Sequence, residues 1–244
     1  MNNFDEVEYR HRFAAWAASS AAMRGQLGLD GEAGKKIIEK AELNALAKGW
    51  EDLPDEHTKF NDWHCDKRRK IIEMFDKELE DKLKSDKTRK KIIKKLATDK
   101  KFKNKAMEEF DEERIEKIKS SLKLSHGRAA KLINVYMKVL FLSSVQDCMQ
   151  QENRKIKKWI HPPVDRQLLI GIKKNFSKVK DRVDSSHDVT FLKYYPTRFN
   201  GKNNEGTPWT RLNSDQYQKI IKAFGHITGS DGLWTIEEYW PGHQ

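Results

Sequence analysis

Residues 128–142 (RAAKLINVYMKVLFL) restrict the fold of this 244-residue chain more than any other stretch. Nearly every position is apolar, a pattern typical of a helix that other helices surround. The exceptions recur at intervals of 3, 3 and 4 and are Arg128, Lys131, Asn134 and Lys138. This spacing puts the polar residues on one side, so the sequence predicts a buried helix with a single polar stripe. Such a stripe must face either water or a cleft.

Helical patterns run through most of the remaining chain. Further helices are expected at about 4–23, 32–47, 58–81, 106–120 and 214–224. Residues 185–211 differ, because Gly, Pro and Ser punctuate them and their only strand-like run is VTFLKYY. They predict a long irregular excursion or a short β-hairpin within a mainly α fold.

The length allows one substantial domain or two small ones. We expect an N-terminal helical region over residues 1–105 and a second helical region over residues 106–244, packed together as one unit. The composition is 37% hydrophobic and 35% charged, with seven Trp. This balance can supply a core, and it excludes collagen-like and wholly disordered chains.

The two cysteines, Cys65 and Cys148, are too few for a disulfide framework, a four-thiolate zinc site or a four-cysteine iron–sulfur cluster. We therefore expect no cofactor and no metal site. Residues 1–10 are acidic overall and lack the basic start and the apolar run of a signal peptide. No apolar run in the sequence reaches the roughly 18 residues that a membrane span needs. These features predict a cytoplasmic protein without membrane contact, which we expect to be a monomer.

Positive charge is concentrated in one segment. The formal net charge is +11, and residues 82–105 alone carry twelve Lys or Arg against two Asp. We expect a helix that docks an apolar edge and presents a cationic face to a polyanion. The candidate contacts are Lys90, Lys91, Lys94 and Lys95. A solvated face that serves only solubility is the alternative.

A helical hairpin is expected directly before the apolar helix. One helix closes at Leu122, the short turn KLSHG follows, and the next helix opens at Arg128. Free amides at residues 125–129 and the positive end of the helix dipole would favour an anion there.

A second local pattern follows further along the chain. Pro162 and Pro163 force an extended approach to Val164 and Asp165, after which an apolar helix begins. Asp165 is therefore expected to cap the N-terminus of that helix.

The hairpin Gly127-Arg128-Ala129-Ala130-Lys131, the apolar helix and the pair Val164-Asp165 together resemble the helix-hairpin-helix DNA glycosylase superfamily (HhH-GPD). The likeness is greatest to its 8-oxoguanine DNA glycosylase branch, and it covers roughly residues 115–175. The chain departs from the family in two places. Ala129 replaces the second Gly of the usual hairpin, whose Pro is also absent, and residues 143–158 insert a polar segment between the two helices.

The resemblance implies an enzyme that acts on double-stranded DNA. It implies Asp165 as the catalytic carboxylate and Lys131 as the nucleophile of those members that also cut the strand. It further implies that the hairpin binds a DNA phosphate through Ser125, His126, Gly127, Arg128 and Ala129. Candidates for a pocket around the flipped base are Trp16, His161, Trp209, Trp234 and Tyr239.

The implied roles agree with the chemistry of base removal. Breaking an N-glycosidic bond builds positive charge on the deoxyribose, and a carboxylate such as Asp165 close to C1′ stabilises that charge. A neutral lysine that attacks C1′ forms a Schiff base. The branch implies an oxidised purine as substrate, and a hypermodified base in phage DNA, excised in defence, is also compatible with the breadth of the superfamily.

Two alternatives remain open at this stage. A helix-hairpin-helix module without catalysis would explain non-specific DNA binding. Arg154 and His161, with six residues between them, also fit the Arg-x(4 to 6)-His spacing of HEPN-type ribonucleases, which such a small, helical and basic chain resembles.

Overall fold

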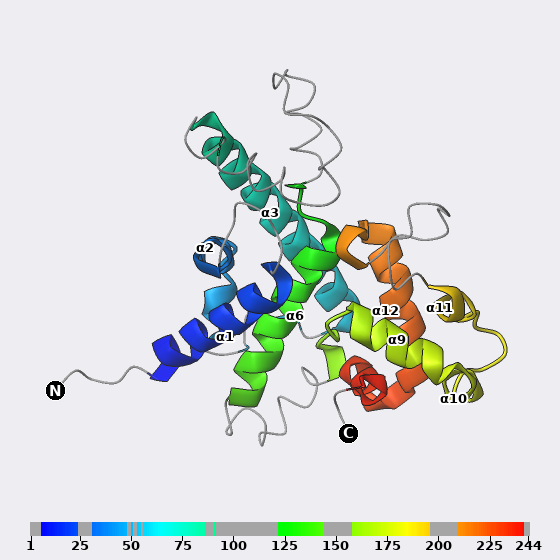
Figure 1. The fold of residues 1–244 in the computed structure, drawn as a ribbon. Coiled ribbons are helices and arrows are strands. Elements are labelled where there is room, and N and C mark those ends of the chain that lie inside the picture. Colours follow the sequence, from blue (N-terminus) through cyan, green and yellow to red (C-terminus); the bar gives the residue numbers. More distant parts are fainter. Residues whose placement is uncertain are drawn as a thin grey trace, which may run out of the picture.

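The computed structural model describes residues 6–23, 31–47, 50, 53–54, 56–85, 90, 122–143, 158–195 and 209–241. Every element within these ranges is a helix, which confirms the mainly α class (Figure 1). In chain order they are α1 (Glu6–Met23), α2 (Gly31–Lys40), η1 (Leu43–Ala47), α3 (His57–Lys84), α6 (His126–Ser143), α9 (Arg166–Lys174), α10 (Phe176–Asp181), α11 (Phe191–Tyr194), η3 (Trp209–Arg211), α12 (Ser214–Thr228), η4 (Gly229–Asp231) and η5 (Leu233–Tyr239).

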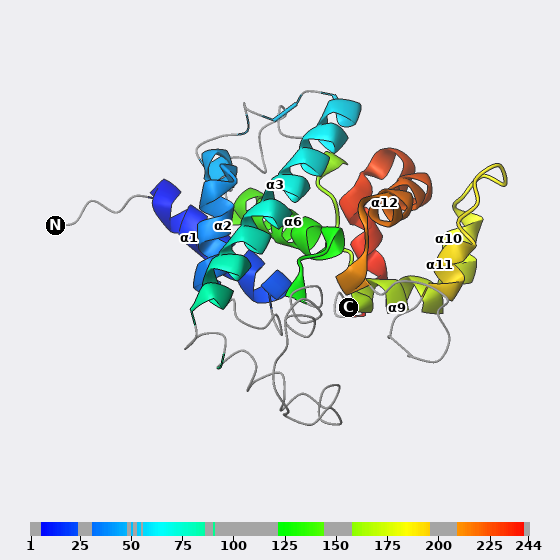
Figure 2. The same cartoon turned by 90° about the horizontal axis from the view of Figure 1, so that it is seen from above.

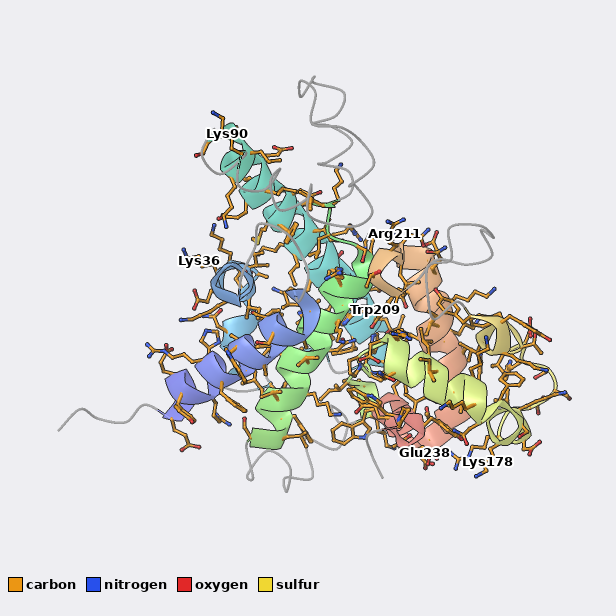
Figure 3. The ribbon with its side chains drawn as sticks, viewed as in Figure 1. Lys36, Lys90, Lys178, Trp209, Arg211 and Glu238 are labelled. Atoms are coloured by element: carbon orange, nitrogen blue, oxygen red, sulfur yellow. The ribbon has the colours of Figure 1, made fainter. Side chains whose placement is uncertain are left out.

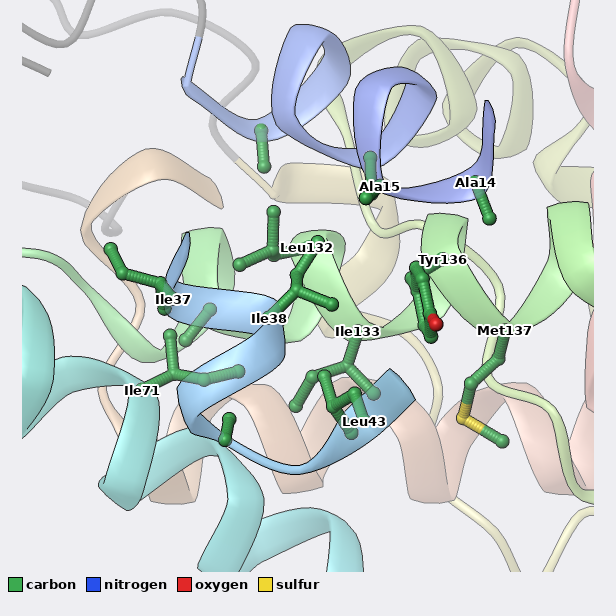
Figure 4. Close-up of a cluster of buried hydrophobic side chains, with 14 of the residues drawn as sticks. Ala14, Ala15, Ile37, Ile38, Leu43, Ile71, Leu132, Ile133, Tyr136 and Met137 are labelled. Carbon is green, nitrogen blue, oxygen red and sulfur yellow. The ribbon is translucent and has the colours of Figure 1, made fainter. Parts of the chain in front are cut away.

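Helix α6 contains the apolar run and lies in the middle of the molecule (Figure 1). It packs mainly on α1 and also contacts α3, α12 and η3. Helix α1 approaches closely because the side facing α6 consists of small residues that are fully buried, namely Ala14, Ala15, Ala18 and Ala22. Figure 4 shows Ala14 and Ala15 in one buried cluster with Leu132 and Tyr136 of α6.

Two hydrophobic cores meet along α6. The larger core combines residues of α1, α2, η1 and α3 with most of the buried residues of α6. The smaller core is formed by α9, α11, α12 and η5, together with Ala130 from α6. Figure 2 separates these two groups, with α1, α2 and α3 on one side and α9 to α12 on the other. The packing thus groups α6 with the N-terminal helices.

The short β-hairpin, one of the two alternatives expected for residues 185–211, has no strand at VTFLKYY. Residues 191–194 form the short helix α11, and the Leu192 amide donates to the Val189 carbonyl oxygen at 3.0 Å. Val189 and Leu192 are both buried, three residues apart on one face. Packing of this face against the smaller core therefore outweighs the strand propensity of Val, Thr, Phe and Tyr. Of the expected excursion over residues 185–211, residues 196–208 lie outside the described residues, and residues 209–211 form η3.

Candidate functional site

The polar stripe of α6 meets the start of α9 at an ion pair. Lys131 Nζ lies 3.0 Å from Asp165 Oδ2, and the two side chains are only 12% and 9% exposed. The two residues are 34 positions apart in the sequence. The fold thus brings into contact the lysine and the carboxylate to which the family resemblance assigns roles in one reaction.

Asp165 is fixed in place by the helix that it caps, which confirms the expected N-cap. Its Oδ1 atom accepts hydrogen bonds from the amides of Gln167 at 2.9 Å and Leu168 at 3.0 Å. The backbone of Asp165 is extended, as is usual for a capping residue. The two hydrogen bonds to Oδ1 therefore orient the carboxylate, and Oδ2 faces Lys131.

Trp209 of η3 covers the lysine. The indole lies 4.7 Å from Lys131 Nζ and 5.7 Å from the guanidinium carbon of Arg128, measured to the ring centroid. Arg128 also donates to the Ala22 carbonyl oxygen at 2.9 Å, which links the stripe to the end of α1. The predicted pocket residue Trp209 is half-buried, and Figure 3 shows it near the middle of the molecule. It forms an aromatic wall beside the ion pair.

The expectation of free hairpin amides is wrong for three of them. The Gly127 amide donates to the Leu212 carbonyl oxygen at 3.3 Å, and the Ala129 amide donates to the Ser125 carbonyl oxygen at 3.0 Å. The Arg128 amide donates to Ser125 Oγ at 3.2 Å. A Cβ on Gly127 would lie 2.0 Å from the Trp209 carbonyl oxygen. The segment 209–212 thus approaches the start of α6 closely and engages one of the amides that a phosphate would need.

Asn134, the next residue of the stripe, joins α6 to the segment that leads to Asp165. Its Nδ2 atom donates to the Pro162 carbonyl oxygen and to Tyr217 Oη, both at 3.0 Å. Its Oδ1 atom accepts from His64 Nε2 at 2.8 Å. All of these side chains are buried. The spacing between Lys131 and Asp165 therefore depends on a buried polar network.

His161 belongs to the same network. Its Nδ1 atom lies 3.0 Å from Tyr217 Oη, and its Nε2 atom lies 3.0 Å from Asn61 Oδ1. The side chain is 1% exposed, and burial, together with the nearby His64 and Arg68, holds its pKa well below the usual value. Both ring nitrogens are thus engaged away from solvent, which suits a structural role better than a base pocket or ribonuclease chemistry. Arg154 lies outside the described residues.

The stripe ends at a second, partly buried ion pair beside a cavity. Lys138 pairs with Glu237 of η5, which is 3% exposed. Together with Trp234 and Thr235 they line a cavity of about 340 Å³. Among the described residues Glu237 Oε1 has no hydrogen-bond partner. The cavity thus combines an aromatic wall with a paired cation and carboxylate.

The remaining predicted residues are scattered. Trp16 is 63% exposed on α1, whereas Tyr239 is buried in the smaller core. Lys90 lies exposed beyond the end of α3 (Figure 3). Lys91, Lys94 and Lys95 lie outside the described residues.

Sequence reasoning missed several polar residues of the site. His64 and Arg68 are fully buried, and the Arg68 guanidinium lies 4.5 Å from the centroid of the Tyr217 ring. A signal for them existed, because α3 buries Phe60, His64, Arg68, Ile71, Phe75, Leu79 and Leu83 at helical spacing. A His and an Arg on that stripe indicate buried polar contacts. Glu237 carried no comparable signal.

The comparisons with known proteins add no assignment: no family model, no curated protein and no solved structure matches this chain. No helix in the described part of the chain is sufficiently long and apolar to cross a membrane. Within the same residues, no group of three or more His, Cys, Asp or Glu side chains could hold a metal ion.

Proposed function

We propose that this protein is a DNA glycosylase that excises a modified base from double-stranded DNA, with the helix-hairpin-helix arrangement of that superfamily. The observation that carries the proposal is the contact between Lys131 and Asp165. A lysine and a helix-capping carboxylate, both mostly buried and in contact, suit the removal of a base from its sugar. The contact arises from residues 34 positions apart, so nothing in local sequence requires it.

Asp165 would act on the sugar. As the bond between C1′ and the base breaks, its electron pair leaves with the base and positive charge grows on the deoxyribose. A carboxylate held by two amides cannot turn away from that charge and pays little reorganisation energy as it forms. In this role Asp165 stabilises the transition state more than the bound substrate.

If the enzyme also cuts the DNA strand after it removes the base, Lys131 would be the nucleophile of that second reaction. The departing base must gain a proton, and an amine must lose one before it can attack C1′. Transfer of a proton from the Lys131 ammonium to the base meets both needs. The amine nitrogen then bonds to C1′, and loss of the ring oxygen bond gives an imine to the opened sugar. If water attacks instead, the product is an intact abasic site.

The cavity beside Lys138 is our candidate for the pocket of the flipped base. Lys131 and Lys138 are seven residues apart on one helix, so they share a face and lie about 10 Å apart along the axis. A flipped base is usually held against an aromatic wall and read along its Watson–Crick edge. Trp234 supplies such a wall in this cavity.

The ion pair in this cavity favours a guanine-type base. A base that enters the cavity and displaces part of this ion pair could donate hydrogen bonds to the Glu237 carboxylate and accept them from the Lys138 ammonium. The six-membered ring of guanine presents two donors, N1–H and the 2-amino group, next to the O6 acceptor. An oxidised guanine matches this arrangement, and so does a modified guanine in phage DNA, which would give the enzyme a role in defence.

A panel of labelled duplexes tests the proposal. Each duplex carries one modified base, among them 8-oxoguanine, and alkali after incubation cleaves the strand at any abasic site. We expect cleavage at one or more modified guanines and none at the unmodified control. Tight binding to every duplex without cleavage of any would instead indicate a non-catalytic DNA-binding module.

A further inference from the structure

A second concave site lies between the first turns of α3 and helix α12. Its volume is about 740 Å³, within the range typical of small-molecule sites. The lining residues include His57 and Asn61 of α3, Trp159, and one face of α12. Neither Lys131 nor Asp165 is among them. Figure 2 shows the start of α3 beside α12, on the side of the molecule away from α9.

The lining is cationic and contains no carboxylate. Lys158, Lys219 and Lys222 line the cavity, and no Asp or Glu is among the lining residues. The three lysines are exposed, and a concave wall of one charge sign concentrates the electrostatic potential inside it. The ligand that this lining favours therefore carries negative charge.

The rest of the lining favours a flat ligand. The half-buried Trp159 lines the cavity together with the buried Ile221 and the buried Leu233. Backbone is also accessible at Gly229, where φ is 53° and an added Cβ would meet nothing within 4 Å. An indole and aliphatic side chains next to ammonium groups suit a planar heterocycle joined to a phosphate.

Asn61 supplies a polar group for the heterocycle. Its Oδ1 atom accepts from His161 Nε2 at 3.0 Å, which fixes the amide plane. Its Nδ2 atom lies 3.5 Å from His57 Nδ1, the limiting distance for a hydrogen bond. The amide N–H groups therefore remain able to donate to a ring nitrogen or carbonyl oxygen.

We propose that this cavity binds a nucleotide, with its base against Trp159 and its phosphate among Lys158, Lys219 and Lys222. The nucleotide is either a free nucleoside phosphate or one residue of a DNA strand, since both offer the same chemistry. Neither Lys131 nor Asp165 lines the cavity, so nucleotide binding there does not depend on the glycosylase function.

Calorimetric titration of the whole protein tests this site with three probes: ADP, inorganic phosphate and a single-stranded oligonucleotide. The variant replaces Lys158, Lys219 and Lys222 by Gln. The control replaces Lys173, Lys178 and Lys180 by Gln, three exposed lysines of α9 and α10 that do not line the cavity. Both triple variants remove three positive charges, so they separate a local site from a general charge effect.

We expect ADP or the oligonucleotide to bind the wild type and the control alike, and to bind the cavity variant at least about tenfold more weakly. Binding of ADP identifies the free nucleotide as the source, and binding of the oligonucleotide alone identifies the DNA strand. A Trp159→Leu variant should also weaken binding. Failure of both probes to bind, equal loss in both triple variants, or inorganic phosphate binding as tightly as the nucleotides would overturn the proposal.

Discussion

Replacing Asn134 by Ala should destabilise the protein more than its position on a polar stripe suggests. The Asn134 side chain is 1% exposed, and it makes three hydrogen bonds to groups from three other parts of the fold. The partners are His64 of α3, the Pro162 carbonyl oxygen and Tyr217 of α12. Alanine removes all three bonds at once and leaves these partners in the interior.

The expected loss in the free energy of unfolding follows from the number of buried groups that lose their hydrogen-bond partner. A buried donor or acceptor that loses its partner costs about 1–3 kcal/mol. With three such groups, and some relaxation around the smaller side chain, we expect a loss of about 3 kcal/mol in the free energy of unfolding. For a chain of this size, each kcal/mol lowers the melting temperature by about 2–4 °C. Asn134→Ala should therefore melt about 6–12 °C below the wild type.

Thermal unfolding at neutral pH measures this effect, with Asn175→Ala as the matched control. The Asn175 side chain makes one hydrogen bond, to the Gly171 carbonyl oxygen at 2.9 Å, and is only half-buried. The control should lose about 1 kcal/mol or less. If Asn134→Ala melts as close to the wild type as the control does, Asn134 does not hold α6 to the segment before Asp165.

Three further predictions concern pH, salt and the lysine. Burial, with a smaller contribution from the Arg68 charge, lowers the pKa of His64 from 6.5 to about 3. The unfolded chain therefore binds a proton that the folded chain does not, and stability should fall as pH drops from 6.5 toward 3, by about 1.4 kcal/mol per pH unit for this group. Urea unfolding at several pH values should show a shallower dependence for His64→Gln. Affinity for undamaged duplex should fall with salt at a slope of about −0.9 per phosphate contact, and changing Lys90, Lys91, Lys94 and Lys95 to Ala should flatten it; an unchanged slope would make the segment a solvated face. Lys131→Gln should impair base release, and borohydride should trap a covalent adduct of the wild type with substrate DNA. Efficient release without an adduct would leave Lys131 an electrostatic or positioning role.

The sequence predicted the elements of the site better than their contacts. The intervals of 3, 3 and 4 along α6 correctly indicated one polar side, and two prolines before Asp165 correctly indicated a capped helix. The contact between Lys131 and Asp165 could not be predicted in the same way. It depends on how α9 packs across α6, which local spacing does not determine.

The errors have tertiary causes. VTFLKYY has the propensity of a strand, but burial of Val189 and Leu192 on one face favours a helical turn. The Gly127 amide has no acceptor nearby in sequence, whereas the Leu212 carbonyl oxygen reaches it from far along the chain. At these two places a distant partner outweighs the local preference. The Arg128 and Ala129 amides are instead satisfied locally, by Ser125.

Single-turnover base release by Asp165→Asn tests the catalytic pair most directly, on the base that the duplex panel identifies. Asn is as good an N-cap as Asp, so the variant keeps the helix. It removes the negative charge beside the mostly buried Lys131, so we predict a lower melting temperature. We predict a DNA affinity close to that of the wild type, and a rate of base release by the folded variant at least about 100-fold lower. Release at the wild-type rate would contradict the assignment of Asp165 as the carboxylate that stabilises the transition state.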